Sequence, residues 1–177
     1  PDAMFPHQRD LVTWALRRGR SAVFADTGLG KTRIGLAWAD QVPGDVLILT
    51  PCAVAPQMVA EGIEVGINVT HCRTGDDVRP GINVTNYERL HLFDASRFTG
   101  VMLDESSCIK HHDTKTLKQL LDVFADTPFK LCATATPAPN DWTELGTHAE
   151  FLGVCSRSEM LAEFFVHDGG DTQTWRL

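Results

Sequence analysis

The sequence lacks long apolar runs and the features of a secreted chain. No apolar run reaches the roughly 18 residues that a membrane-spanning helix needs. The N-terminal stretch PDAMFPHQRD has neither the basic nor the apolar region of a signal peptide. These absences argue against a secreted or membrane-embedded protein, and we expect a cytoplasmic one.

Paired cysteines are also lacking. The five cysteines are scattered singly along the chain, at positions 52, 72, 108, 132 and 155, and no CxxC pair occurs. A zinc ribbon needs paired ligands and a disulfide framework needs an even set, so neither is supported. Free thiols in a reducing cytosol are the simpler expectation.

An excess of basic residues is missing as well. Sixteen Lys and Arg stand against 23 Asp and Glu, which leaves a formal net charge of −7. This balance argues against a broad basic surface for nucleic acid. Any contact with nucleic acid must be local, or must depend on a partner or a further segment.

What the 177 residues do contain is an alternation of apolar β-branched runs and amphipathic stretches, enough for one domain. Strands are predicted at residues 21–26, 45–51, 67–72, 81–86, 100–105 and 129–136. Helices are predicted at residues 31–42, 54–63, 114–126 and 141–152, and another begins at Ser156. Several strands are apolar on both faces, as parallel strands covered by helices are. The pattern predicts an α/β fold with a mostly parallel sheet and helices on both faces, and Trp14 and Trp38 are expected in its core.

A glycine-rich turn lies between the first strand and the first of these helices, in VFADTGLGKTRIGLAWA. It meets the pattern GxxxxGK[ST] at Gly30, Lys31 and Thr32, except that Ala25 stands at the first glycine position. Gly28 and Gly30 let the backbone curl so that N–H groups point at phosphate oxygens, and the helix dipole adds to this potential. The predicted ATP-binding residues are Ala25, Asp26, Thr27, Gly28, Leu29, Gly30, Lys31 and Thr32. Lys31 would reach the β- and γ-phosphates, and Thr32 would ligate Mg²⁺.

Two adjacent carboxylates end another strand, in VMLDESSCIK. Burying such a pair is costly unless a positive group lies opposite. Ligands of an open parallel sheet bind at the carboxyl edge, where the phosphate loop also ends its strand. We therefore predict that Asp104 holds Mg²⁺, mostly through water, and that Glu105 orients and deprotonates the attacking water. The alternative is an acid pair at a helix N-terminus, beside the capping residues Ser106 and Ser107.

In this order, six segments resemble motifs of one family. They are PHQRDLVTWAL, ADTGLGKT, VLILTPCAVAPQMVAE, VTNYERL, LDESS and TATPAPNDWTEL. Together they cover nearly the whole chain and are similar to the first RecA-like lobe of a superfamily-two helicase or translocase of the Swi/Snf-like branch. The family usually has a tryptophan near Met58, where this chain departs. Ser106 and Ser107 resemble bacterial or phage members.

The resemblance implies a protein that couples ATP hydrolysis, with Mg²⁺, to movement along nucleic acid, generally duplex DNA. It places Gln8 at the adenine edge, with Arg9 beside it. It assigns backbone contacts with nucleic acid to Thr50, Pro51, Thr85, Asn86 and Tyr87, whose hydroxyls, amides and N–H groups suit phosphate. For Tyr87, a core aromatic with a bonded hydroxyl is the open alternative.

Coupling to nucleotide state is expected at the end of the last predicted strand. Hydroxyls of Thr134 and Thr136 can bond Glu105 or Ser107, although a simple strand-end turn stopped by Pro137 is the alternative. The roles of two basic stretches remain open. Residues 17–20 are a solvated helix end or a DNA patch, and residues 109–118 are a solvated segment or a local anion or DNA contact. Adjacent histidines at 111 and 112 diverge on a helix, so a metal site there is not expected.

The family places ATP between two lobes, of which the second supplies arginine fingers. Nothing after Trp142 resembles those later motifs. We therefore expect residues 1–177 to be the ATP-binding lobe of a longer protein, weakly active alone. Two other functions stay open: a P-loop phosphotransferase acting on a small molecule, which needs an arginine-bearing lid, and a non-catalytic nucleic-acid-binding module.

Overall fold

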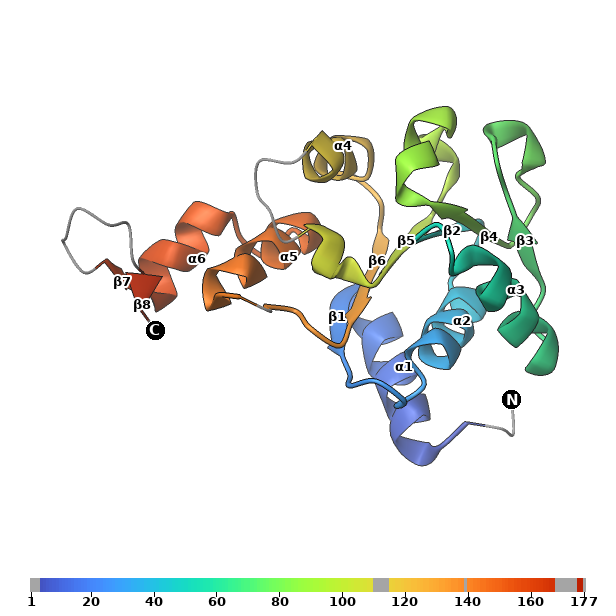
Figure 1. Cartoon of the computed structure of the whole chain (residues 1–177), viewed down its shortest axis with the longest axis horizontal. Coiled ribbons are helices and arrows are strands. Elements are labelled where there is room, and N and C mark those ends of the chain that lie inside the picture. Colours follow the sequence, from blue (N-terminus) through green and yellow to red (C-terminus); the bar gives the residue numbers. More distant parts are fainter. Residues whose placement is uncertain (1–3, 110–114, 139, 168–174, 177) are drawn as a thin grey trace.

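A six-stranded sheet with every strand parallel forms the centre of the fold in the computed structural model (Figure 1). The structure describes residues 4–109, 115–138, 140–167 and 175–176. In spatial order the strands are β1 (Arg20–Phe24), β6 (Phe129–Thr134), β5 (Gly100–Asp104), β2 (Val46–Thr50), β4 (Ile82–Asn86) and β3 (Val69–His71). Parallel neighbours require crossover connections, and these place helices on the two faces of the sheet.

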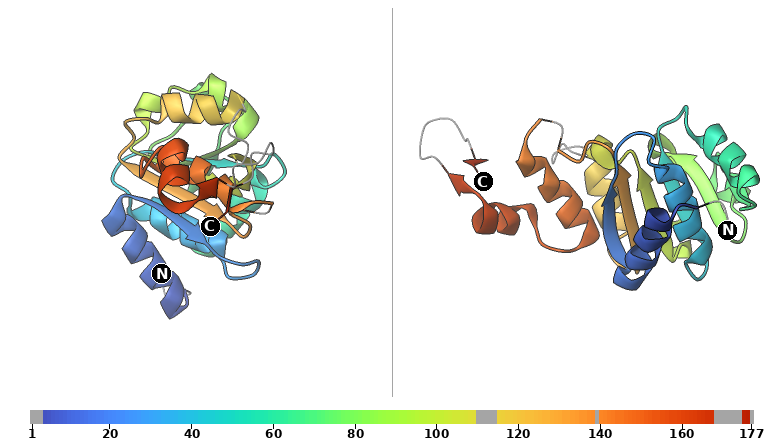
Figure 2. Two further views of the ribbon diagram at one scale, coloured as in Figure 1. Left: turned by 90° about the vertical axis from the view of Figure 1, so that its left-hand side faces the viewer. Right: turned by 90° about the horizontal axis from the view of Figure 1, so that it is seen from below.

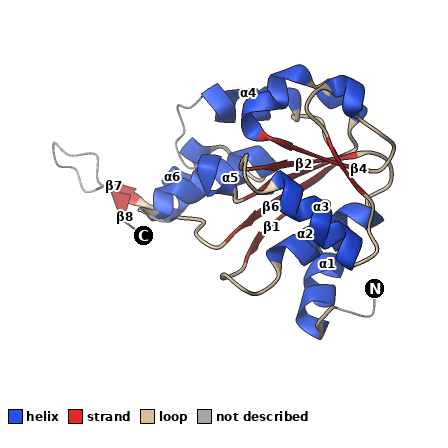
Figure 3. Ribbon diagram, turned by 45° about the vertical axis from the view of Figure 1, so that its right-hand side comes forward, coloured by secondary structure: helices blue, strands red, loops and turns tan. Residues whose placement is uncertain are grey.

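One face is covered by α1 (Pro6–Arg18), α2 (Lys31–Gln41) and α3 (Ala55–Glu64), and the other by α4 (Lys115–Val123) with short 3₁₀ turns (Figures 1 and 3). Of these turns, η2 (Tyr87–Leu92), η3 (Ala95–Arg97) and η4 (Ser106–Ile109) contribute buried residues to this face, whereas η1 (Gly75–Asp77) and η5 (Trp142–Glu144) contribute none. Helix α5 (Leu145–Leu152) packs beside α4 and η4. Helix α6 (Arg157–Phe164) and the hairpin of β7 (Val166–His167) and β8 (Trp175–Arg176) lie away from the sheet (Figure 2).

The strands feed two separate cores because successive side chains point to opposite faces. In β2, Val46 and Ile48 pack with the α1–α3 layer, whereas Leu47 and Leu49 pack with the opposite layer. All five residues of β2 are buried. The prediction of a parallel α/β sheet with helices on both faces is confirmed, and the six predicted strands all form.

The predicted helices form as α2 to α6, with small shifts at their ends. Helix α1 is not among the predicted elements, although residues 17 and 18 do form an exposed helix end capped by Gly19. Trp38 is fully buried, but Trp14 is 43% exposed, so its assignment to the core is wrong. Residues 110–114 lie outside the described residues. Within the described part, no helix has the length and apolar character needed to cross a membrane.

Lys130 on β6 is a buried cation that the sequence patterns did not single out. Its side chain is 3% exposed, and Nζ donates to the carbonyl oxygen of Phe151 at 3.0 Å and of Ala125 at 3.5 Å. Nζ also lies 5.0 Å from the centroid of the Phe151 ring. Burial, with the nearby charge of Arg20, lowers the pKa of Lys130 from 10.5 to about 8.

This lowered pKa predicts how stability changes with pH. Between pH 8 and 10.5 the folded Lys130 has lost its proton while the unfolded one keeps it, so its contribution to stability rises with pH. The difference in melting temperature, wild type minus Lys130→Met, should therefore increase as pH rises from 7 to 10. Lys118→Met, at an exposed position of α4, is the control. A difference between wild type and Lys130→Met that stays constant over this range would contradict the prediction.

Candidate functional site

The carboxyl ends of β1, β5 and β6 bring the phosphate loop and the two carboxylates together. A cavity of about 450 Å³ opens there. Its lining consists of Thr27, Gly28, Gly30, Lys31, Thr32, Arg33, Val54, Gln57, Glu61, Asp104 and Glu105. This is the edge at which ligands of open parallel sheets bind, and it brings together residues as far apart in the chain as Thr27 and Glu105.

The phosphate loop runs from the end of β1 to the start of α2. Gly28 and Gly30 have φ of 84° and 78°, which only glycine adopts without strain. Gly30 is the N-terminal flanking residue of α2, and its carbonyl accepts the first helical bond from the N–H of Ile34 at 3.0 Å. Asp26 accepts from the N–H of Thr27 at 2.7 Å, which shapes the turn. Ala25, at the position where the pattern has glycine, is buried and extends the pairing of β1 with β6.

Gln8 is tied to this loop. Its Nε2 donates to the carbonyl oxygen of Leu29 at 3.0 Å, and its Oε1 accepts from the N–H of Phe5 at 3.0 Å. A side chain added at Gly30 would collide with the amide of Gln8. The predicted adenine-edge residue and the phosphate loop are therefore in direct contact, while Arg9 is exposed and donates to the carbonyl of Met4 at 3.2 Å.

The two carboxylates differ in environment. Asp104 is 4% exposed, and its Oδ2 accepts from the hydroxyl of Thr50 at 2.9 Å. Burial raises the pKa of the Asp104 carboxyl, and the charge of Glu105 adds to this, whereas Thr50 and Lys31 oppose it. Glu105 is half-exposed, and its Oε1 lies 4.0 Å from Nζ of Lys31. Asp104, at the strand end, is thus the more enclosed acid, and Glu105 is the more exposed one at the cavity.

Thr134, at the end of β6, contacts both parts of the site. Its hydroxyl donates to Oε2 of Glu105 at 3.4 Å and accepts from the N–H of Thr136 at 3.1 Å. Its carbonyl oxygen accepts from the N–H of Ala25 at 3.2 Å. Thr134 is therefore placed between the phosphate loop and Glu105, as a coupling residue would need to be. Thr136 is exposed, and Ser107 is partly exposed beside the site.

Four of the five residues expected at nucleic acid have buried side chains. They are Thr50, Thr85, Asn86 and Tyr87, and Pro51 is partly exposed. Asn86 accepts from the N–H of Arg89 at 3.1 Å, and the hydroxyl of Tyr87 donates to the backbone oxygen of Asp104 at 2.7 Å. Tyr87 is therefore the bonded core aromatic of the open alternative, and burial raises the pKa of its hydroxyl well above the usual value. A contact of this segment with nucleic acid stays a prediction.

Several residues near the cavity were not foreseen. Arg33, Gln57 and Glu61 line it, and the last two lie four positions apart on α3. Gln57 and Glu61 are spaced i and i+4 on the helix that follows Pro51, so they lie on the same face of α3. This spacing could have indicated that the face lines the site. Ser106, buried behind Glu105, bonds His148 of α5, and no sequence pattern pointed to that pair.

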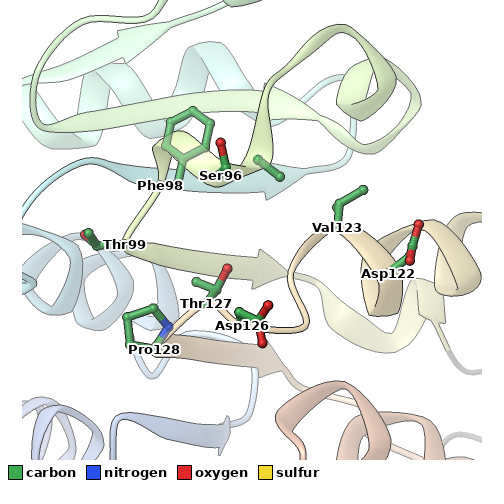
Figure 4. Close-up of a pocket in the computed structure, with 9 residues that line it drawn as sticks. Ser96, Phe98, Thr99, Asp122, Val123, Asp126, Thr127 and Pro128 are labelled. Atoms are coloured by element: carbon green, nitrogen blue, oxygen red, sulfur yellow. The ribbon is translucent and has the colours of Figure 1, made fainter.

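A second cavity lies at the opposite edge of the sheet, where β5 and β6 begin (Figure 4). It measures about 330 Å³ and is lined by Ala95, Ser96, Phe98, Thr99, Asp122, Val123, Asp126, Thr127 and Pro128. Its lining contains two carboxylates and no basic side chain. Two carboxylates without a neighbouring lysine or arginine in the lining make this cavity unfavourable for phosphate.

Comparison with known proteins agrees with the sequence motifs. No family model matches the chain. The DNA annealing helicase and endonuclease ZRANB3 of Bos taurus is 29% identical over 169 residues, which is 84% of this chain and 16% of that protein. The chain thus spans about a sixth of the length of this curated relative.

Solved structures show the same fold. The Sulfolobus solfataricus SWI2/SNF2 ATPase core in complex with dsDNA superposes with a TM-score of 0.69 at 20% identity, covering 90% of this chain and 38% of that one. The UvsW helicase from bacteriophage T4 gives 0.69 at 16% identity, covering 84% and 57%. The Pyrococcus furiosus Hef helicase domain gives 0.66 at 15% identity, covering 83% and 35%. The predicted resemblance is confirmed for the fold, which the chain shares with these SWI2/SNF2 ATPase and helicase structures, and the chain spans only part of each of these proteins.

Proposed function

We propose that this chain is the ATP-binding lobe of a DNA-dependent ATPase of the helicase or translocase type, which couples ATP hydrolysis to movement on nucleic acid. The observation that carries the proposal is the placing of Glu105. Its Oε1 lies 4.0 Å from Nζ of Lys31, and its Oε2 lies 3.4 Å from Oγ1 of Thr134. Lys31 follows a loop of phosphate-binding geometry. A base beside the phosphate-binding lysine, and in contact with a neighbouring strand, suits hydrolysis linked to conformational change.

ATP would be held mainly by residues 25–32. Backbone N–H groups of the loop and the N-terminus of α2 would bind phosphate oxygens, with Lys31 at the β- and γ-phosphates. Gln8 and Arg9 would lie toward the adenine, and the bond from Gln8 to Leu29 would link adenine recognition to the loop.

The residues present fit Mg²⁺. This ion usually takes one or two carboxylates together with phosphates and water, so Asp104 and the hydroxyl of Thr32 form a sufficient protein contribution. A cation beside Asp104 would also favour the ionised form of a carboxyl whose pKa burial raises. When bound, Mg²⁺ would neutralise phosphate charge during transfer.

The partners that we propose are duplex DNA and a second RecA-like lobe of the same protein. In support, one similar structure is a SWI2/SNF2 ATPase core in complex with dsDNA, of which this chain covers 38%. Pro51 and the backbone of residues 85–87 would contact phosphates, because a chain of net charge −7 suits local contacts rather than a broad basic face. A cytoplasmic location would suit the five free cysteines. The resemblance of Ser106 and Ser107 supports a bacterial or phage origin, and one similar structure is from bacteriophage T4.

Nucleotide binding by this chain tests the proposal. Lys31→Ala should weaken ATP binding by about 10- to 100-fold, because a charged hydrogen bond contributes roughly 1.5–3 kcal/mol. The measurement is titration of a fluorescent ATP analogue with Mg²⁺, and Lys118→Ala, exposed on α4, is the matched control. Equal affinities of wild type and Lys31→Ala would remove the loop from its proposed role. Phosphate transfer to a small molecule, rather than to water, would favour a phosphotransferase.

A further inference from the structure

The backbone at Glu105 has an unusual conformation. Its φ is 49°, the only positive value at a non-glycine residue in the described part of the chain. A left-handed backbone is unfavourable for a residue other than glycine, so the surrounding structure must hold it. This conformation sets the direction in which the carboxylate leaves the end of β5.

The polar contacts of the carboxylate itself are long. Oε2 lies 3.4 Å from the hydroxyl of Thr134, and Oε1 lies 4.0 Å from Nζ of Lys31. Hydrogen bonds and ion pairs at these separations are weak restraints. The position of the carboxylate therefore depends on the backbone that carries it.

That backbone is held on both sides by buried hydrogen bonds. Before Glu105, the carbonyl oxygen of Asp104 accepts from the hydroxyl of Tyr87 at 2.7 Å. After it, Oγ of Ser106 lies 3.0 Å from Nε2 of His148. Ser106 is fully buried and His148 is 2% exposed, so water does not compete for this bond.

A ring contact also restrains His148. It lies in α5, and its ring meets the ring of Phe24 edge-on, with the centroids 5.6 Å apart. Burial lowers the pKa of His148, although the carbonyl and the charge of Glu144 oppose this. A neutral imidazole has one donor and one acceptor nitrogen, and a serine hydroxyl can pair with either.

We propose that His148 is a positioning residue for ATP hydrolysis: through Ser106 it holds the backbone of Glu105 so that the carboxylate faces the cavity. The inference rests on the proposed function, and it deepens it by adding a residue 43 positions away from the base. Tyr87 restrains the other side of the same turn. His148 does not line the cavity, so its effect should pass entirely through Glu105.

The test is steady-state ATP turnover of the full-length protein that contains this chain, with duplex DNA. His148→Ala should lower kcat by about 10- to 100-fold and leave KM for ATP within about twofold, because small displacements of a catalytic group cost rate more than binding. His148→Gln, whose amide can reach the position of Nε2, should recover most of the rate. His91→Ala is the control, since His91 is an exposed histidine in η2.

Testing His148→Ala in the Glu105→Gln variant distinguishes a positioning role from a purely structural one. In Glu105→Gln, the further change His148→Ala should have almost no effect on kcat, because the group on which it acts is already lost. Equal loss of rate from His148→Ala in both backgrounds, or a rise in KM that matches the fall in kcat, would overturn the inference. Ser106→Ala is a smaller change at the same bond, and it should repeat the result if His148→Ala unfolds.

A readout without turnover distinguishes failure of this inference from failure of the proposed function. In the 177-residue chain, amide hydrogen exchange at residues 104–108 should be at least tenfold faster in Ser106→Ala than in wild type, with exchange in β2 unchanged. No ATP turnover by the wild type would defeat the proposed function. If the wild type turns over ATP, but Ser106→Ala leaves exchange unchanged and both His148→Ala and Ser106→Ala leave kcat unchanged, only the role of His148 is defeated.

Discussion

Replacing Glu105 by glutamine should lower ATP turnover by about 10²–10⁴-fold, the usual contribution of a general base. Glutamine has nearly the same shape but cannot take a proton from water. ATP affinity should change little, because Glu105 is 4.0 Å from Lys31 and its charge is not needed to hold phosphate. The measurements are steady-state hydrolysis with duplex and with single-stranded DNA, and ATP titration of both proteins.

Glu163→Gln provides the control for this change, since Glu163 is an exposed acid on α6 and lies outside the cavity lining. It should leave both turnover and affinity unaltered. Equal turnover of wild type and Glu105→Gln would show that another group activates water. The same comparison with the two kinds of DNA also reports which nucleic acid stimulates hydrolysis.

The second large effect concerns the loss of the second RecA-like lobe, which would contact the nucleotide from the side opposite this chain. The 177-residue chain should hydrolyse ATP about 10³–10⁵-fold more slowly than a longer protein in which a second RecA-like lobe follows it, the range attributed to an arginine finger. In the part of the chain that the structure describes, the cations lining the cavity are Lys31 and Arg33. Arg33 lies 3.8 Å from Oε2 of Glu64, so its charge already has a partner.

Turnover rates of the lone chain and of the longer protein, measured at saturating ATP with and without duplex DNA, check this expectation. Substituting the arginines of the second lobe that face the nucleotide should return the longer protein to the rate of the lone chain. Fast, DNA-stimulated hydrolysis by the 177 residues alone would contradict it, because the charge stabilisation would then come from within this lobe.

Local patterns were sufficient for much of the site. The strand before the glycine-rich turn, the helix after it and the acid pair at another strand end are each short segments whose chemistry is visible in consecutive residues. Parallel strands place their carboxyl ends at one edge, so the meeting of Lys31 and Glu105 could be predicted without coordinates. Their 4.0 Å separation agrees with that expectation.

Other assignments depended on burial, which short patterns do not determine. Tyr87 follows β4 with the residue types of a surface segment, yet its ring fills the core and its hydroxyl bonds Asp104. Trp14 has core chemistry and helical spacing, yet α1 leaves it 43% exposed. Both outcomes depend on which face of an element meets its neighbours, and that is decided by the packing of the whole layer.

By itself, the sequence determined the parallel α/β sheet, the phosphate loop and the two carboxylates at its edge, because hydrophobic period and turn chemistry are local properties. Only the tertiary structure decided that Ser106 rather than Ser107 is the buried serine, and that His148 is its partner. The physical reason is distance along the chain: a hydrogen bond between residues 42 positions apart exists only after α5 has packed beside η4. Glu105, the proposed base, therefore lies between two hydrogen bonds that only the fold creates.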